Sequence, residues 1–165
     1  DNNPVIFLEY KAQYNMKGEV PTDPDFVLPI GKADLKRTGK DVTVVTYGRM
    51  LERVLKAADM ALEKGIEVEV VDLMTLMPLD KEAIINSVKK TGRVLLVNDA
   101  HKTGGFLGEI AAVITESDAF DYLDNRILRL AAEDIPTPYN HSLEVAMLPD
   151  ANRILEYIER LYTKR

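Results

Sequence analysis

The stretch Asp41-Val42-Thr43-Val44-Val45-Thr46-Tyr47-Gly48 holds the pattern that decides the fold of this chain. Its β-branched run predicts a strand over residues 42–45, and a glycine turn ends it. A helix that stops at Gly65 is predicted next, and residues 68–71 are expected to form a second strand. That helix should bury one face, formed by residues at helical spacing: Leu51, Val54, Leu55, Ala58 and Leu62.

The same strand and helix unit recurs toward the carboxyl end of the chain. Strands are predicted at 94–97 and 127–130, and the first is apolar throughout, as in a parallel sheet covered on both faces. Asp80 and Asp150 are expected to cap helices, and another helix should follow Gly104-Gly105. This alternation predicts an α/β fold, a three-layer α/β/α sandwich. The helices should bury Ile84, Ile85, Val88, Ile110, Val113, Ile114, Ile154, Leu155, Ile158 and Leu161.

The sequence upstream of this alternation has a different character. Val5-Ile6-Phe7-Leu8 has the composition of a strand, but no helical period follows it, so we interpret it as an isolated strand. A glycine and three prolines then predict an extended connector. A short strand at 33–36 should join the next strand through a tight turn at Thr38-Gly39-Lys40. The predicted parts are residues 1–12, a linker over 13–31 and a domain over 32–165.

Composition and charge narrow the function classes. The chain has 165 residues, with 21 Lys and Arg against 27 Asp and Glu, and a formal net charge of -6. An acidic surface repels phosphate backbones and anionic lipids, so nucleic-acid and membrane partners are disfavoured. Cysteine is absent, which excludes disulfides, a thiolate nucleophile and a Cys-ligated zinc. The chain does not begin with Met and reaches a strand-like run at Val5, which suggests a piece of a longer protein.

Ligands of open parallel sheets collect at the carboxyl ends of the strands, so chemistry is expected there. The most site-like of these ends is Asp99-Ala100-His101-Lys102-Thr103-Gly104-Gly105, because a His and a Lys precede a glycine pair at an expected helix start. Free N–H groups at that start would be able to hold a small anion. We favour a tight turn with an interface histidine, since the lysine precedes the glycines and does not follow them as in a phosphate loop.

Other catalytic constellations are weak. Asp99 and His101 are two candidate metal ligands, but there is no Cys and no second His near them in the sequence. No serine has the context of a nucleophile elbow, and the glycine motif of dinucleotide-binding folds is missing. Glu67 and Glu69 alternate with strand residues and are expected to face solvent. The sequence therefore predicts no catalytic, cofactor-binding or metal-ligating residue.

The order of the motifs resembles a known family. The resemblance is carried by ordered segments at 3–9, 18–21, 29–34, 41–48, 71–73, 78–80, 90–93 and 101–106. They resemble the carboxyl-terminal half of the β subunit of thiamine diphosphate-dependent 2-oxo acid dehydrogenases, which act on pyruvate or branched-chain substrates. The acetoin dehydrogenase β subunit is equally close, so the substrate stays open. The resemblance implies a transketolase C-terminal-type domain, with a five-stranded mixed sheet whose first strand, near 33–36, is antiparallel to the rest.

The resemblance also implies where the cofactor lies. Residues 1–12 would hold the last strand of a preceding pyrimidine-binding domain. That domain and the α subunit would supply the thiamine diphosphate and magnesium sites of the parent complex. The family pattern therefore implies no cofactor in this chain, and no activity of this chain alone.

Assembly is the role that the family pattern assigns to this domain. Its partners would be an α subunit and a second β subunit, with an expected interface at His101, Lys102, Thr103, Gly104, Gly105 and Phe106. The parent would pass its acyl group to a lipoyl acyltransferase component, whose basic docking domain would meet Asp121 and Asp124. Lys164 and Arg165 make the chain end basic, which departs from that pattern. The expected location is the cytoplasm, or the mitochondrial matrix in a eukaryote.

A second hypothesis remains open. The chain would then be a stand-alone α/β module that binds a small anion at the loop from Lys102 to Gly105. A parent chain about twice this length would support the assembly domain, and a native 165-residue chain would support the module.

Overall fold

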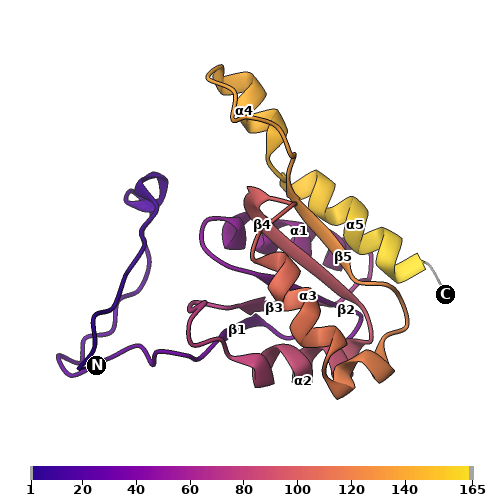
Figure 1. Cartoon of the computed structure of the whole chain (residues 1–165), viewed down its shortest axis with the longest axis horizontal. Helices are drawn as coiled ribbons and strands as arrows, with labels where there is room; N and C mark the ends of the chain where they lie inside the picture. The colour runs from indigo at the N-terminus through magenta and orange to yellow at the C-terminus, as the bar shows by residue number, and fades with distance from the viewer. Residues whose placement is uncertain (1, 164–165) are drawn as a thin grey trace.

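A computed structural model describes residues 2–163. Its centre is a five-stranded sheet in the order β1-β3-β2-β4-β5 (Figure 1). The strands are β1 (Asp34–Arg37), β2 (Val42–Thr46), β3 (Val68–Asp72), β4 (Val94–His101) and β5 (Leu128–Ala132). β1 is antiparallel to β3, whereas the β2–β3, β2–β4 and β4–β5 pairs are parallel. The predicted mixed sheet with an antiparallel first strand is confirmed.

Helices cover both faces of the sheet and complete the predicted three-layer sandwich. α1 (Met50–Glu63) and α5 (Ala151–Thr163) share one core with the sheet. α2 (Lys81–Thr91) and α3 (Leu107–Thr115) share the second core, on the opposite face. Strands β2, β3 and β4 contribute apolar side chains to both cores, so consecutive residues of each strand are buried on opposite faces of the sheet.

Capping residues begin two of the helices as predicted. The backbone N–H of Ala83 donates to the Asp80 carboxylate over 3.2 Å at the start of α2. The N–H of Arg153 donates to the Asp150 carboxylate over 2.8 Å at the start of α5. Both side chains satisfy N–H groups that a helix leaves free in its first turn.

One predicted core position differs from the structure. Leu62 lies near the end of α1 and is half exposed, since the helix buries Ala57, Ala58 and Ala61 in its last turns. Ile85 is partly buried and packs against the α2 core. The other predicted helix positions are buried or partly buried.

The turn at Thr38-Gly39-Lys40 connects two strands that do not pair. β3 lies between β1 and β2, so the turn carries the chain across the end of β3. The N–H groups of Lys40 and Asp41 donate to the Glu67 carbonyl over 3.1 and 2.9 Å. A Cβ at Gly39 would come within 2.3 Å of the Val68 carbonyl carbon, so only glycine fits there.

Two segments project from the layered body (Figure 1). The first, here called the arm, comprises residues 2–31 and contains one short 3-10 helix, η1 (Lys11–Gln13). Its residues 5–8 form no strand of the sheet and are exposed, so the predicted isolated strand is not formed here. The second is the loop after β5 with α4 (His141–Met147), a helix that the sequence reading missed. A further 3-10 helix, η2 (Asp118–Tyr122), follows α3 in the sequence and packs against α2 and α3.

Candidate functional site

The topology defines a crevice at the carboxyl ends of β2 and β4. The chain leaves β2 through α1 on one face of the sheet, and leaves β4 through α3 on the other face. Neighbouring strands with crossovers on opposite faces leave an opening between their ends, where α/β proteins bind ligands. In this chain, Tyr47 to Arg49 and Asn98 to Asp99 border that opening.

Tyr10 of the arm occupies this crevice. Its hydroxyl lies 3.4 Å from Asp99 Oδ1, and its ring lies 5.7 Å from the Arg49 guanidinium carbon. Arg49 Nε donates to Asp99 Oδ2 over 2.6 Å, so the three side chains form one cluster. A Cβ at Gly48, whose φ is 63°, would lie 2.6 Å from the Tyr10 ring. The crevice that other α/β proteins use for a ligand holds a residue of this chain.

A buried amide lies below this cluster. Asn98 is fully buried and its Nδ2 donates to the Tyr47 hydroxyl over 2.8 Å, while its Oδ1 has no hydrogen-bond partner within the described residues. The Tyr47 ring packs edge-on against Phe106, with ring centres 6.3 Å apart. Burial raises the pKa of Tyr47, although the Asn98 amide opposes that effect. Tyr47 therefore stays neutral at physiological pH.

The predicted interface loop is a tight turn. His101 ends β4, and its Nε2 lies 3.0 Å from the Ile135 carbonyl oxygen, to which it donates. A Cβ at Gly105 would lie 2.3 Å from the His101 carbonyl oxygen, and Gly104 has a φ of 73°. Both glycines are thus required by the backbone, and α3 starts just after Phe106. Phe106 packs on Tyr47, within the domain.

A carboxylate of the chain itself holds the donors of this loop. Asp134 accepts hydrogen bonds from the Thr103 N–H over 2.9 Å and from the Thr103 hydroxyl over 2.7 Å. These hydrogen bonds hold the pKa of Asp134 below its ordinary value. The loop therefore already binds an internal anion, which argues against the small-anion module. His101, Lys102 and Thr103 are exposed, so their interface role stays a prediction.

The two acids of the predicted acyltransferase docking site are both exposed. Asp121 lies in η2, and Asp124 lies in the loop that leads to β5. Asp124 also forms an ion pair of 3.5 Å with Arg93. Their docking role stays a prediction.

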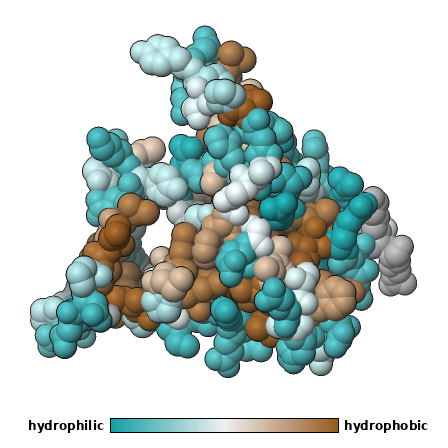
Figure 2. Space-filling model, viewed as in Figure 1, coloured by the Kyte–Doolittle hydropathy of each residue, from teal (hydrophilic) through white to brown (hydrophobic). Residues whose placement is uncertain are grey.

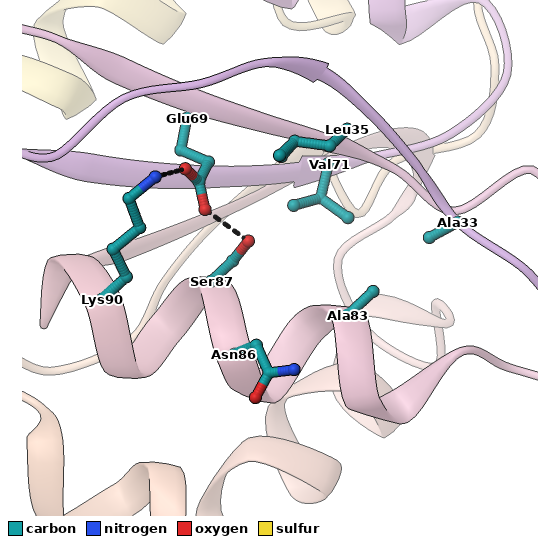
Figure 3. A pocket seen from close by; sticks show the side chains of 8 residues that line it. All are labelled: Ala33, Leu35, Glu69, Val71, Ala83, Asn86, Ser87 and Lys90. Carbon is teal, nitrogen blue, oxygen red and sulfur yellow. Dashed lines mark hydrogen bonds and ion pairs between the residues drawn. The ribbon is translucent and has the colours of Figure 1, made fainter.

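The second hollow lies between β1 and α2 (Figure 3). It has a volume of about 300 Å³ and is lined mainly by small or apolar side chains, with a carboxylate at one end: Ala33, Leu35, Glu69, Val71, Ala83, Asn86, Ser87 and Lys90. Glu69 points from β3 toward α2, where Ser87 and Lys90 meet it. The hollow is therefore an apolar surface depression beside a paired charge.

Glu69 corrects the expectation that it faces solvent. It is 2% exposed, accepts a hydrogen bond of 2.6 Å from the Ser87 hydroxyl and one of 3.3 Å from the Gly39 N–H, and forms an ion pair with Lys90. The cause is the α2 layer, which covers this face of β3. Because these three donors satisfy the carboxylate, its role is to join the β1 turn, β3 and α2. Glu67 has the predicted exposed position and pairs with Lys40.

The described residues form neither a metal site nor a membrane-spanning helix. Within residues 2–163, no group of three or more His, Asp or Glu side chains is placed to hold a metal ion. In the same part of the chain, each helix is too short or too polar to cross a bilayer.

Comparisons with known proteins identify the fold. Residues 31–154 match the family model "Transketolase, C-terminal domain". The chain is 49% identical over 156 residues to the 2-oxoisovalerate dehydrogenase subunit beta of Bacillus subtilis, covering 93% of this chain and 47% of that protein. It is 44% identical over 161 residues to the pyruvate dehydrogenase E1 component subunit beta of Porphyra purpurea, covering 98% of this chain and 48% of that protein.

Two further proteins show the same similarity. The Bacillus subtilis acetoin:2,6-dichlorophenolindophenol oxidoreductase subunit beta is 43% identical, covering 94% of this chain and 45% of that protein. A solved structure described as a split-gene transketolase, an inactive beta4 tetramer, matches with a TM-score of 0.72 and 26% identity, over 86% of this chain and 44% of that chain. The chain spans about half the length of the curated relatives it matches. By its sheet order and by the match over most of its length, the chain belongs to the transketolase C-terminal domain family.

Proposed function

We propose that this chain is the assembly domain of the β subunit of a thiamine diphosphate-dependent 2-oxo acid or acetoin dehydrogenase. The proposal rests on one observation, the exposure of large apolar side chains on the two projecting segments. In the arm these are Val5, Ile6, Phe7, Leu8, Val20, Phe26, Val27, Leu28 and Ile30, and in the second projection Ile135, Tyr139, Leu143 and Val145. Figure 2 shows apolar residues of the arm bordering an opening between the arm and the body.

Such a distribution indicates contacts with other chains or domains. Large exposed apolar patches mark interaction sites in folded proteins, whereas most apolar residues of the body of this domain are buried. The curated relatives are β subunits, by name, of proteins about twice this length. Residues 1–12 would then belong with a preceding pyrimidine-binding domain, and α4 would contact an α subunit or a second β subunit. Asp121 and Asp124 would receive the lipoyl acyltransferase component.

The cofactor would lie outside this domain. Tyr10 fills the crevice between β2 and β4, where its ring lies against Gly48 and its hydroxyl lies 3.4 Å from Asp99 Oδ1. With Tyr10 in place this crevice does not fit thiamine diphosphate, so no chemical step is assigned to its residues. This chain alone would be inactive, and its contribution to the parent would be positional. The cytoplasm, or the mitochondrial matrix of a eukaryote, would be its location.

The test compares two exposed leucines in the full β subunit, co-expressed with its α subunit. Leu143 of α4 is 59% exposed and Leu62 of α1 is 50% exposed. Leu143→Ser should leave the subunit folded but greatly lower the fraction of assembled heterotetramer, measured by mass photometry. Leu62→Ser is the matched control and should assemble normally. Equal assembly of the two variants would contradict the proposal.

The predicted loop interface has its own test. His101→Ala should lower the assembled fraction more than it lowers turnover per assembled tetramer, because the ring only holds the Ile135 carbonyl. A general base at this position would instead lose roughly 100-fold or more in turnover with assembly intact. That second outcome would overturn the interface role.

A further inference from the structure

A basic groove lies along the outer edge of β5. It has a volume of about 300 Å³, and its lining contains four cationic side chains together with apolar and aromatic ones: Lys102, Arg126, Ile127, Leu128, Arg129, Tyr157 and Arg160. β5 pairs only with β4, so its other side is an edge of the sheet. The cations come from three places in the chain: the end of β4, the segment 126–129 and α5.

These four cations have no acidic partner in the part of the chain that the structure describes. Among residues 2–163, no ion pair involves Lys102, Arg126, Arg129 or Arg160. The chain as a whole carries a net charge of -6, so acidic residues are plentiful elsewhere. Four like charges around one hollow repel each other, and an anion in the hollow would relieve that repulsion.

Local contacts hold two of the arginines in position. Arg129 Nη1 donates to the Lys102 carbonyl over 3.2 Å, which joins the first residue after β4 to the beginning of β5. The Arg160 guanidinium lies over the Tyr157 ring, 5.9 Å from its centre. A guanidinium fixed in this way loses little side-chain entropy when it binds, and its planar fork matches phosphate oxygens.

We propose that this groove binds a compact polyanion with a diphosphate group, whether inorganic or part of a nucleotide. A single carboxylate would leave most of the positive charge unbalanced, whereas a diphosphate offers several oxygens to the guanidinium forks. The volume is that of a small-ligand site. Tyr157, Ile127 and Leu128 add an apolar wall beside the charged groups. The groove is at the β5 edge, whereas Tyr10 sits between β2 and β4.

The test is calorimetric titration of the 165-residue chain with sodium diphosphate and, separately, with ATP, both without magnesium. The Arg126→Gln/Arg160→Gln double variant should weaken diphosphate binding at least about tenfold, because each arginine would contribute charged hydrogen bonds. Lys81→Gln removes one exposed cation from α2, on a different part of the surface, and should leave the affinity unchanged. Binding should also weaken as NaCl is raised.

The two ligands separate the sources of the diphosphate group. Equal affinity for diphosphate and ATP would mean that the groove recognises the diphosphate group alone. Tighter binding of ATP would mean that the apolar wall beside Tyr157 also contacts the ligand. Both results support the site. Absence of binding at millimolar diphosphate, or an equal loss in Lys81→Gln, would overturn it. Binding of an acidic peptide without binding of diphosphate would also overturn it and would make the groove a protein-docking edge.

Discussion

The body of this domain and its two projections use the same kinds of apolar residue in opposite ways. Ile154 and Ile158 of α5 are fully buried, whereas Ile6 and Phe7 of the arm are 87% and 77% exposed. Both regions are rich in large apolar residues, although only α5 repeats them at helical spacing. The difference lies in the sheet, which covers α5 and has no counterpart over the arm. A segment rich in apolar residues is thus expected to be covered, but its own sequence does not show which part of the molecule or which partner covers it.

The largest expected effect tests this contrast directly. Ile158→Ala should destabilise the chain by about 2–5 kcal/mol, since it leaves a cavity in the core shared by α1, α5 and the sheet. Ile6→Ala, which removes the same atoms from an exposed site, should change stability by less than about 0.5 kcal/mol. Urea unfolding followed by circular dichroism measures both. Similar losses in the two variants would mean that the arm belongs to the folding unit.

The contrast also applies to charges within β3. Glu69→Gln should cost about 1–3 kcal/mol, because the buried carboxylate receives three hydrogen-bond donors. Glu67→Gln is the control and should cost at most about 1 kcal/mol, since its partner Lys40 is exposed. Both values come from the same urea titration. A smaller loss for Glu69 than for Glu67 would contradict the assigned joining role.

Gly48 lies where the arm meets the body. Gly48→Ala should cost about 1–2 kcal/mol for its left-handed backbone and should displace the Tyr10 ring. The displaced arm should become more sensitive to limited proteolysis, while the body stays intact. Tyr10→Ala should give the same proteolysis without the backbone cost. Unchanged cleavage of the arm in both variants would refute the proposed seating of Tyr10.

The smallest effect concerns a buried carboxylate at the end of β3. Burial raises the pKa of Asp72, although the Met74 N–H and nearby Lys36 oppose this. A raised pKa means that the folded state holds the Asp72 proton more tightly than the unfolded state, so the ionised form lowers stability as pH rises through that pKa. Asp72→Asn should therefore stabilise the chain slightly at pH 7, and the gain should vanish below the ordinary pKa of aspartate. Thermal melts of both proteins across about pH 3–7 measure this difference in stability. A stabilisation by Asp72→Asn that increases toward acidic pH would contradict the raised pKa of Asp72.

Local patterns were sufficient for most of the body. The β-branched run at 42–45 and the continuous apolar run at 94–97 predicted strands, and Asp80 and Asp150 cap their helices as expected. The antiparallel placement of β1 came from the family resemblance. Its partner, β3, lies more than 30 residues along the chain, and a local pattern carries no record of which strand it will meet.

Long-range contacts account for the predictions that failed. Glu69 alternates with valines, as a solvent-facing residue would. However, helices cover both faces of β3, so all five residues of this strand are buried. The α4 helix is short, projects from the body and has a proline-rich approach, so the local pattern favoured a loop. Tyr10 and Arg49 lie 39 residues apart and meet only through the fold. The sequence located the carboxyl edge of the sheet but not the residue that fills it.

Hydrogen bonds at two positions attach the arm to the body, and the segment between these positions should tolerate an inserted sequence. Tyr10 holds one end in the crevice, and the Gly31 N–H donates to the Thr75 hydroxyl over 3.0 Å at the other end. Between these points the chain forms a surface loop, and doubling the length of such a loop costs only about 0.6 kcal/mol in closure entropy. A peptide tag or fluorophore carrier placed near Gly18, where an added Cβ would meet no atom within 4 Å outside the adjacent residues, would therefore report on the arm without displacing either anchor.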